Sequence, residues 1–247
     1  MIVSHNELVA AVNKAFLGMR RTCGEADVIA NMVADLQMVG LDGVRHFNNA
    51  SNFMGLEDDC PVDITTTEDN SIEVDLHGSS LACHLPVIMD FAIEKMVGSK
   101  ALKIELHNCH NRWLAYSELV KLAAKGIACT AQWENGSDPK QTLYVLNRGC
   151  VAPELFFCDS ALETTEHVHN MTIELSVNDF DLKRLSQGYK RHITSSSLAE
   201  TQEKAWRDGI EVDDMEWSSL KETATAILVE NSQRSIQGAG ELTTTAA

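Results

Sequence analysis

The chain has 247 residues and a mass of 27.2 kDa, which suits one large domain or two small ones. Hydrophobic residues make up 44% of it and charged residues 23%, so a packed core is expected and disorder of the whole chain is excluded. The 20 Lys and Arg against 36 Asp and Glu give a net charge of −16, which repels phosphate backbones and anionic lipid. We therefore expect no nucleic-acid partner and no membrane partner.

The N-terminal segment and the cysteines favour a cytoplasmic protein. Residues 1–21 have no basic stretch ahead of their apolar residues and no small-residue cleavage signal, so we expect no secretory peptide. No apolar run reaches the roughly 18 residues that span a membrane. The seven cysteines are odd in number and contain no C-x-x-C pair, which is typical of reduced thiols in the cytoplasm.

The N-terminal part of the chain predicts helices. Ser4 and Glu7 form a capping box, so a first helix is expected to follow them. A second helix is expected from Gly24 to near Gly40, and a third from Gly43 onward, because apolar residues recur there at helical spacing. Residues 56–70 are acidic and read as an exposed connection.

The middle of the chain alternates between strand and helix patterns. One helix is expected to run to Gly98 with Pro86 in its first turn, and another from Asn111 to Lys125. Strands are expected at 72–76, 101–106, 127–132, 142–146, 155–158 and 171–177. The first three of these strands and the two helices make a βαβαβ run, which predicts parallel strands with helices packed on them. The later strands indicate an antiparallel component.

The C-terminal third returns to helix, and the whole pattern predicts one α/β domain with a mixed sheet. Asp213 is the expected N-cap of a last helix. Residues 232–247 have almost nothing to bury and are expected to be a disordered tail. The single α/β domain is expected over 1–231, as a helical N-terminal segment, a sheet core and C-terminal helices at 1–55, 71–177 and 179–231.

One candidate site is the loop 107–110, which reads His-Asn-Cys-His just past a predicted strand. Ligands bind at the carboxyl ends of strands in α/β sheets, so His110 is a candidate acid or base there. Cys109 could serve as a nucleophile if it were ionised. Asn108 and Arg112 are assigned to substrate binding. The alternative is that these side chains only satisfy backbone groups of the loop.

A second candidate is the segment between the first helices, Gly-Leu-Asp-Gly-Val-Arg-His-Phe at 40–47. Asp42 could act as a base, and Arg45 could bind a substrate carboxylate through two hydrogen bonds. His46 completes the candidate acid and base set. In the competing interpretation, Asp42 caps the following helix and Arg45 is solvated.

Metal and phosphate sites have weaker support. Residues 163–169 contain a His-x-His pair flanked by glutamates, which resembles a zinc or iron tract, but no third ligand stands at a suitable spacing. An exposed acidic loop explains the same residues, and we assign no metal. The chain has no glycine-rich phosphate loop. The basic residues 190–192 are expected at the surface.

Several strings resemble the malate/L-lactate dehydrogenase-like family of NAD(P)-dependent 2-oxo acid, diketogulonate and cyclic imino acid reductases, whose fold is unlike the Rossmann dehydrogenases. The strings stand in family order and are GLDGVRHF, VDLHGSSLACHLPVIMDFAIEKM, LHNCHNRWLAYSELVKLAAKGIA, IELSVNDF and AWRDGIEVDDMEWSSL. The last string is the most specific. Together they cover about 1–130 and 170–222. The resemblance implies the family's fold and a homodimer, because the family builds its site across two protomers.

The resemblance also shows departures. The family's catalytic histidine falls on Asp42, and its substrate-binding arginine falls on His46, with Arg45 displaced by one position. His110 matches the histidine of the second loop. Between residues 133 and 169 the family has a far longer stretch that holds the dinucleotide, so the chain resembles a shortened member that lacks most of the nicotinamide-binding segment. No cofactor is therefore firmly implied, although NAD(P) is compatible with the resemblance.

Three functions remain open from the sequence. The first is non-redox acid/base chemistry (a lyase, isomerase or hydrolase) on a small carboxylate-bearing metabolite. The second is NAD(P)-dependent reduction of a 2-oxo or cyclic imino acid with a reduced cofactor site. The third is a catalytically silent relative that binds a metabolite or a partner. The first is favoured, because the chain lacks most of the nicotinamide-binding segment and a resemblance in fold alone does not carry the family's activity.

Overall fold

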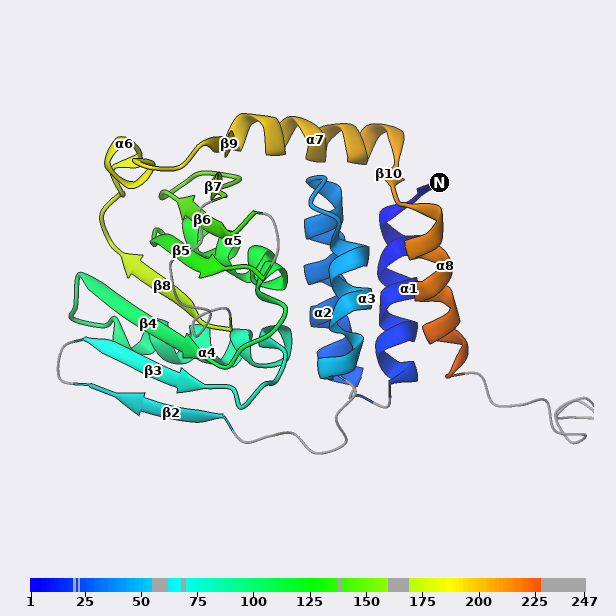
Figure 1. The fold of residues 1–247 in the computed structure, drawn as a ribbon, viewed down its shortest axis with the longest axis horizontal. Coiled ribbons are helices and arrows are strands. Elements are labelled where there is room, and N and C mark those ends of the chain that lie inside the picture. The colour runs from blue at the N-terminus through cyan, green and yellow to red at the C-terminus, as the bar shows by residue number, and fades with distance from the viewer. Residues whose placement is uncertain are drawn as a thin grey trace, which may run out of the picture.

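The structure is a computed structural model that describes residues 1–19, 21, 23–54, 62–67, 70–136, 139–159 and 169–227. A group of upright helices lies beside a twisted mixed sheet, and helices α4 and α5 cover one face of that sheet (Figure 1). The expected tail, 232–247, lies outside the described residues. No helix in the described part of the chain is long and apolar enough to cross a membrane.

The upright helices come from both ends of the chain. They are α1 (His5–Gly18), α2 (Cys23–Met38), α3 (Gly43–Met54) and α8 (Asp214–Thr225). The predicted N-caps are confirmed at Ser4 and Asp213, although of the capping box the described residues show only the bond to the Ser4 side chain. The Ser4 side chain accepts a hydrogen bond from the Glu7 backbone N–H at 3.2 Å, and the Asp213 side chain accepts from the second and third residues of α8. A short pair of strands, β1 (Ile2–Val3) and β10 (Ile210–Glu211), joins the N-terminus to the segment just before α8.

Eight of the described strands form the mixed sheet. They are β2 (Asp63–Thr66), β3 (Ser71–Asp75), β4 (Ala101–His107), β5 (Ala128–Glu134), β6 (Gln141–Leu146), β7 (Glu154–Cys158), β8 (Met171–Ser176) and β9 (Arg191–Ile193). Their order is β2-β3-β4-β8-β5-β6-β7-β9. β3 and β4 are parallel, whereas β8 pairs antiparallel with both β4 and β5. The predicted βαβαβ core is confirmed, with β8 inserted between its second and third strands.

The connections of that core are α4 (Leu81–Lys95), the 3₁₀ turn η1 (Arg112–Ala115) and α5 (Tyr116–Ala124). α4 begins five residues before Pro86, so the expectation that Pro86 lies in the first turn of the helix was wrong. Proline lacks a backbone N–H, and the helix gives up one hydrogen bond at its second turn. Buried residues on both sides, such as Leu85 and Ile88, keep the turn packed.

Other elements differ from the sequence-based expectation. The acidic connection contains β2, an edge strand whose four residues are all exposed, so it carries no apolar alternation that could predict it. α6 (Leu182–Leu185) and α7 (Ser195–Asp208) lie in the C-terminal third. α7 runs as a strap from β9 to β10 above the sheet and the helices (Figure 1). Only Leu198 of α7 is buried.

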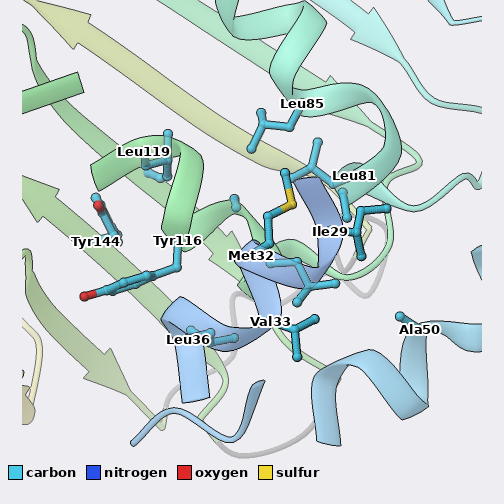
Figure 2. Close-up of a cluster of buried hydrophobic side chains, with 14 of the residues drawn as sticks. Ile29, Met32, Val33, Leu36, Ala50, Leu81, Leu85, Tyr116, Leu119 and Tyr144 are labelled. Atoms are coloured by element: carbon cyan, nitrogen blue, oxygen red, sulfur yellow. The ribbon is translucent and has the colours of Figure 1, made fainter. Parts of the chain in front are cut away.

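The core runs without a break from the helices to the sheet. In Figure 2, side chains of α2 point toward α4 and α5. Ile29, Met32 and Leu36 belong to α2, Leu81 to α4 and Leu119 to α5. α2 is therefore the element that ties the upright helices to the sheet layer. It also fixes the position of the corner that follows it.

Candidate functional site

The corner between α2 and α3 is held by close backbone contacts. Gly40 and Asp42 both have positive φ, at 79° and 51°. A Cβ atom at Gly43 would lie 2.2 Å from the Val33 carbonyl oxygen, so only glycine lets α3 approach α2 this closely. The buried Gln37 side chain accepts a hydrogen bond from the backbone N–H of Val44 at 2.9 Å. The first turn of α3 is thereby fixed against α2.

A pocket of about 620 Å³ opens at this corner, and we call it the corner pocket. It lies between the first turn of α3, the turn η1, the end of β5 and the strands β7 and β9. Its lining side chains include Asp42, Arg45, His46, Asn49, Arg112, Trp113, Trp133, Asn135, Phe157 and Arg191. The structure therefore brings four of the predicted site residues, Asp42, Arg45, His46 and Arg112, to one pocket.

Arg45 is held by carboxylates on both sides. Its guanidinium lies 3.3 Å from Asp42 Oδ2 and 3.2 Å from Glu216 Oε1, at the start of α8. The Asn48 amide donates a hydrogen bond to Glu216 Oε2 at 2.7 Å. Asp42 and Arg45 are both more than half exposed, at 57% and 51%, so they stay open to a ligand. Glu216 fixes where the Arg45 guanidinium lies.

The His46 ring stacks on the Trp113 ring, with centroids 5.6 Å apart. Burial is the largest cause of a shift that lowers the pKa of His46 from 6.5 to about 4. The charges of Asp42 and Glu216 raise that pKa and Arg45 lowers it, but burial outweighs them. The imidazole is therefore neutral at physiological pH and can both donate and accept a hydrogen bond.

Arg112 lies deeper in the wall of the corner pocket. Its guanidinium donates to the carbonyl oxygens of Cys109 at 2.7 Å and of Glu134 at 3.0 Å. Burial lowers its pKa. Its Nε atom is buried and has no hydrogen-bond partner among the described residues, and the same is true of Asn111 Oδ1.

Two other predicted residues, His110 and Asn108, do not line the corner pocket. The His110 ring stacks on Phe53 with centroids 3.7 Å apart and lies 4.6 Å from the His169 ring. Burial, followed by the neighbouring His169, lowers the pKa of His110. The Asn108 amide donates to Asp75 Oδ1 at 3.0 Å, which ties the ends of β3 and β4 together. These contacts agree with the alternative that the loop side chains satisfy their surroundings.

The two remaining chemical candidates are the Cys109 thiol and the His-x-His tract. Burial raises the pKa of the Cys109 thiol to about 11, so at neutral pH it is not the thiolate that a nucleophile requires. Of the His-x-His tract, residues 160–168 lie outside the described residues. Within the described ranges no three His, Cys, Asp or Glu side chains gather as a metal site.

The sequence reasoning missed the aromatic wall and one cation of the corner pocket. Trp133 and Phe157 look like core residues of their strands, and nothing in the chain order says that they meet Trp113. Arg191, expected at the surface, lines the pocket and lies 3.0 Å from Asp159. Trp113 directly follows Arg112, a predicted substrate-binding residue, and this adjacency in the sequence could have pointed to it.

Comparisons with known proteins were made for the sequence and for the fold. Residues 3–85 match a family described as "protein of unknown function" (DUF3726). No curated protein has a sequence that matches this chain.

Solved structures match over nearly the whole fold. A dehydrogenase from Sinorhizobium meliloti superposes with a TM-score of 0.69 at 10% identity, covering 91% of this chain and 99% of that one. The malate dehydrogenase from Pyrococcus horikoshii gives 0.69 at 10% identity, covering 93% and 96% of the two chains. The delta1-piperideine-2-carboxylate reductase from Pseudomonas syringae gives 0.63 at 10% identity, covering 90% and 99%. The resemblance found in the sequence strings is thus confirmed at the level of the fold: the chain has the malate/L-lactate dehydrogenase-like fold.

Proposed function

We propose that the chain is an enzyme acting on the carbonyl or imine group beside the carboxylate of a small metabolite, with the corner pocket as its active site. The observation that carries this proposal is the meeting of Asp42, Arg45, His46 and Arg112 in one pocket. Arginine suits a carboxylate because its planar guanidinium matches two oxygens. The dehydrogenase and reductase names of the structural neighbours support an activity on such acids.

The roles follow from charge and burial. Arg112 and Arg45 bind the substrate carboxylate. Neutral His46 donates a hydrogen bond to the carbonyl oxygen or the imine nitrogen of the substrate, which polarises the reacting double bond. The exposed side chain of Asp42 is the acid or base that transfers a proton to or from the substrate.

Reduction with NAD(P)H is one reaction class, favoured by the structural neighbours. The corner pocket suits such a cofactor in two respects. Trp113 offers a ring face on which a flat ring can stack, and Arg191 is an exposed cation beyond the two arginines that bind the carboxylate. Arg191 would hold a phosphate. The cofactor, when bound, supplies the hydride that a carbonyl needs for reduction.

Non-redox proton transfer is the other class, and the same residues support it. Asp42 would remove a proton from the carbon beside the carbonyl while His46 stabilises the developing charge on oxygen. This reaction needs no group beyond the four side chains.

A thermal-shift titration with NADH and NADPH, alone and with small 2-oxo acids, separates the two classes. A ligand at 100 times its Kd raises the free energy of unfolding by about 2.7 kcal/mol. A shift with either nucleotide, together with its oxidation when an oxo acid is added, supports reduction. No nucleotide shift, together with deuterium exchange beside the carbonyl in heavy water, supports proton transfer. Binding of no oxo acid would refute both.

Variants tie the activity to the corner pocket. Asp42→Asn should lower kcat by at least about 100-fold, because a positioned acid or base contributes that much. Arg112→Gln should raise KM more than it lowers kcat. The matched control is Arg148→Gln, whose pair with Asp179 lies on the exposed surface, and it should leave both constants unchanged.

His110→Gln tests the sequence-based role of His110: a loss equal to that of Asp42→Asn would place it in the reaction.

A further inference from the structure

One wall of the corner pocket is aromatic. The Trp113 ring meets Trp133 edge to face at 5.1 Å, and it lies 6.2 Å from Phe157. On another side it stacks on His46 at 5.6 Å. Three chain segments that are distant in sequence therefore supply rings to one wall.

Burial separates the roles of these rings. Trp133 and Phe157 are only 4% and 7% exposed, so neighbouring side chains cover their ring faces and leave little surface for a ligand. Trp113 is half-buried and lines the pocket, so it presents open ring surface to a ligand. The buried rings brace it from behind, which keeps the orientation of that surface fixed.

Three cations line the pocket, although the chain as a whole carries −16. Arg45 is paired with Asp42 and Glu216, and Arg191 with Asp159, whereas the printed hydrogen bonds of Arg112 go to backbone carbonyl oxygens. Arg191 also lies over the Phe157 ring, with its guanidinium carbon 5.8 Å from the centroid. Positive charge and ring surface are thus neighbours within one cavity of about 620 Å³, ample for a ligand with both an anionic end and a ring.

We propose that the substrate is a carboxylate that bears an aromatic or heteroaromatic ring, with the ring on Trp113 and the carboxylate at Arg112. This inference rests on the proposed function, since it names the class of acid that the corner pocket takes. A short aliphatic acid would fill the arginine end and leave the Trp113 face in water. A ring would cover that face and gain both apolar burial and stacking. We expect aryl acids to bind at least about 10-fold more tightly than aliphatic ones.

The test is a binding titration of the full chain by calorimetry and tryptophan fluorescence. The ligands are pyruvate, ketoisocaproate, phenylpyruvate and indolepyruvate, which share one oxo-acid group and differ in the attached side chain. Ketoisocaproate is the control for size, because it is apolar and has no ring. Phenylpyruvate and indolepyruvate should bind at least about 10-fold more tightly than ketoisocaproate and should change the tryptophan emission.

Two variants assign the effect to one ring. Trp113→Leu should abolish the preference for aryl acids over ketoisocaproate. Trp113→Phe keeps a ring and should retain part of the preference, so it serves if the leucine variant fails to fold. Trp206→Leu is the matched control, because Trp206 is 62% exposed on α7 and stacks on His5 away from the pocket. It should change neither affinity.

The outcomes separate this inference from the proposed function. Equal affinities for phenylpyruvate and ketoisocaproate would overturn the aryl preference and leave the carboxylate site standing. Competition in which NADH or NADPH displaces phenylpyruvate while pyruvate stays bound would also overturn it, because the Trp113 face would then belong to the nicotinamide. Binding of none of the four acids would overturn both.

Discussion

At the scale of single residues, His46 makes stability depend on pH. Its pKa is about 4 in the folded chain against 6.5 when it is solvated, so the folded state holds fewer protons between these values. The contribution of this pKa shift to the free energy of unfolding is fully present above about pH 6.5 and is lost as the pH falls toward about 4. It amounts to less than about 3 kcal/mol. His46→Phe keeps a ring on Trp113, and urea denaturation across this range should show a shallower pH dependence. An unchanged slope would contradict the shift.

Glu216 acts on the site through Arg45. Glu216→Gln removes the charge that faces the Arg45 guanidinium and weakens the acceptor of Asn48. We expect a loss of about 1 kcal/mol in the free energy of unfolding, since the group is largely buried, and a weaker carboxylate affinity. Glu222→Gln makes the same change at an exposed position of α8 and should alter neither quantity. Equal effects of the two variants in chemical denaturation would refute a positioning role.

Two of the predicted residues that line the corner pocket, Asp42 and Arg45, take no part in the apolar pattern of a helix or strand. Asp42 and Arg45 stand beside glycines at a helix junction, where polar side chains have no core to pack against. Trp133 and Phe157 could not be found this way, because a strand residue that faces a pocket has the same pattern as one that faces the core. His110 shows the converse, since its loop position is that of a site residue but its ring packs on Phe53.

At the scale of elements, the α2–α3 crossing depends on one missing side chain. Gly43→Ala would place a methyl group 2.2 Å from the Val33 carbonyl oxygen, on backbone that cannot move without shifting α2. We expect a loss of about 3 kcal/mol, which exceeds the gain of at most about 1 kcal/mol from alanine in a helix. Gly24→Ala is the control, because nothing lies within 4 Å of its added Cβ, and it should stabilise the chain slightly. A stable Gly43→Ala protein in thermal denaturation would disprove the close crossing.

Elements with a strong apolar stripe or a cap were predicted from the sequence, and elements without one were not. α1 and α8 have side-chain caps that the sequence shows. α7 buries only Leu198, and β2 buries nothing, so neither has a periodicity to read. The position of β8 between β4 and β5 is also hidden from local patterns, because strand order depends on pairings between residues about 70 and 45 positions apart.

At the scale of the whole molecule, the resemblance implies that two chains act together. We propose a homodimer, and light scattering at micromolar concentration should give a mass near twice 27.2 kDa. A dimer that completes the site would also make the Tm rise with protein concentration. A monomeric mass over the whole concentration range would contradict the proposal.

The late position of β8 has a consequence for synthesis on the ribosome. β4 and β5 each present an open backbone edge until β8 pairs with both of them, and about 40 residues separate the end of β5 from the end of β8. At a translation rate of roughly 5–20 residues per second, the nascent chain carries these two unpaired edges for about 2–8 s. Open edges recruit other strands, so this interval is when the emerging chain most needs a chaperone. Once β8 arrives, a single strand closes both edges at once.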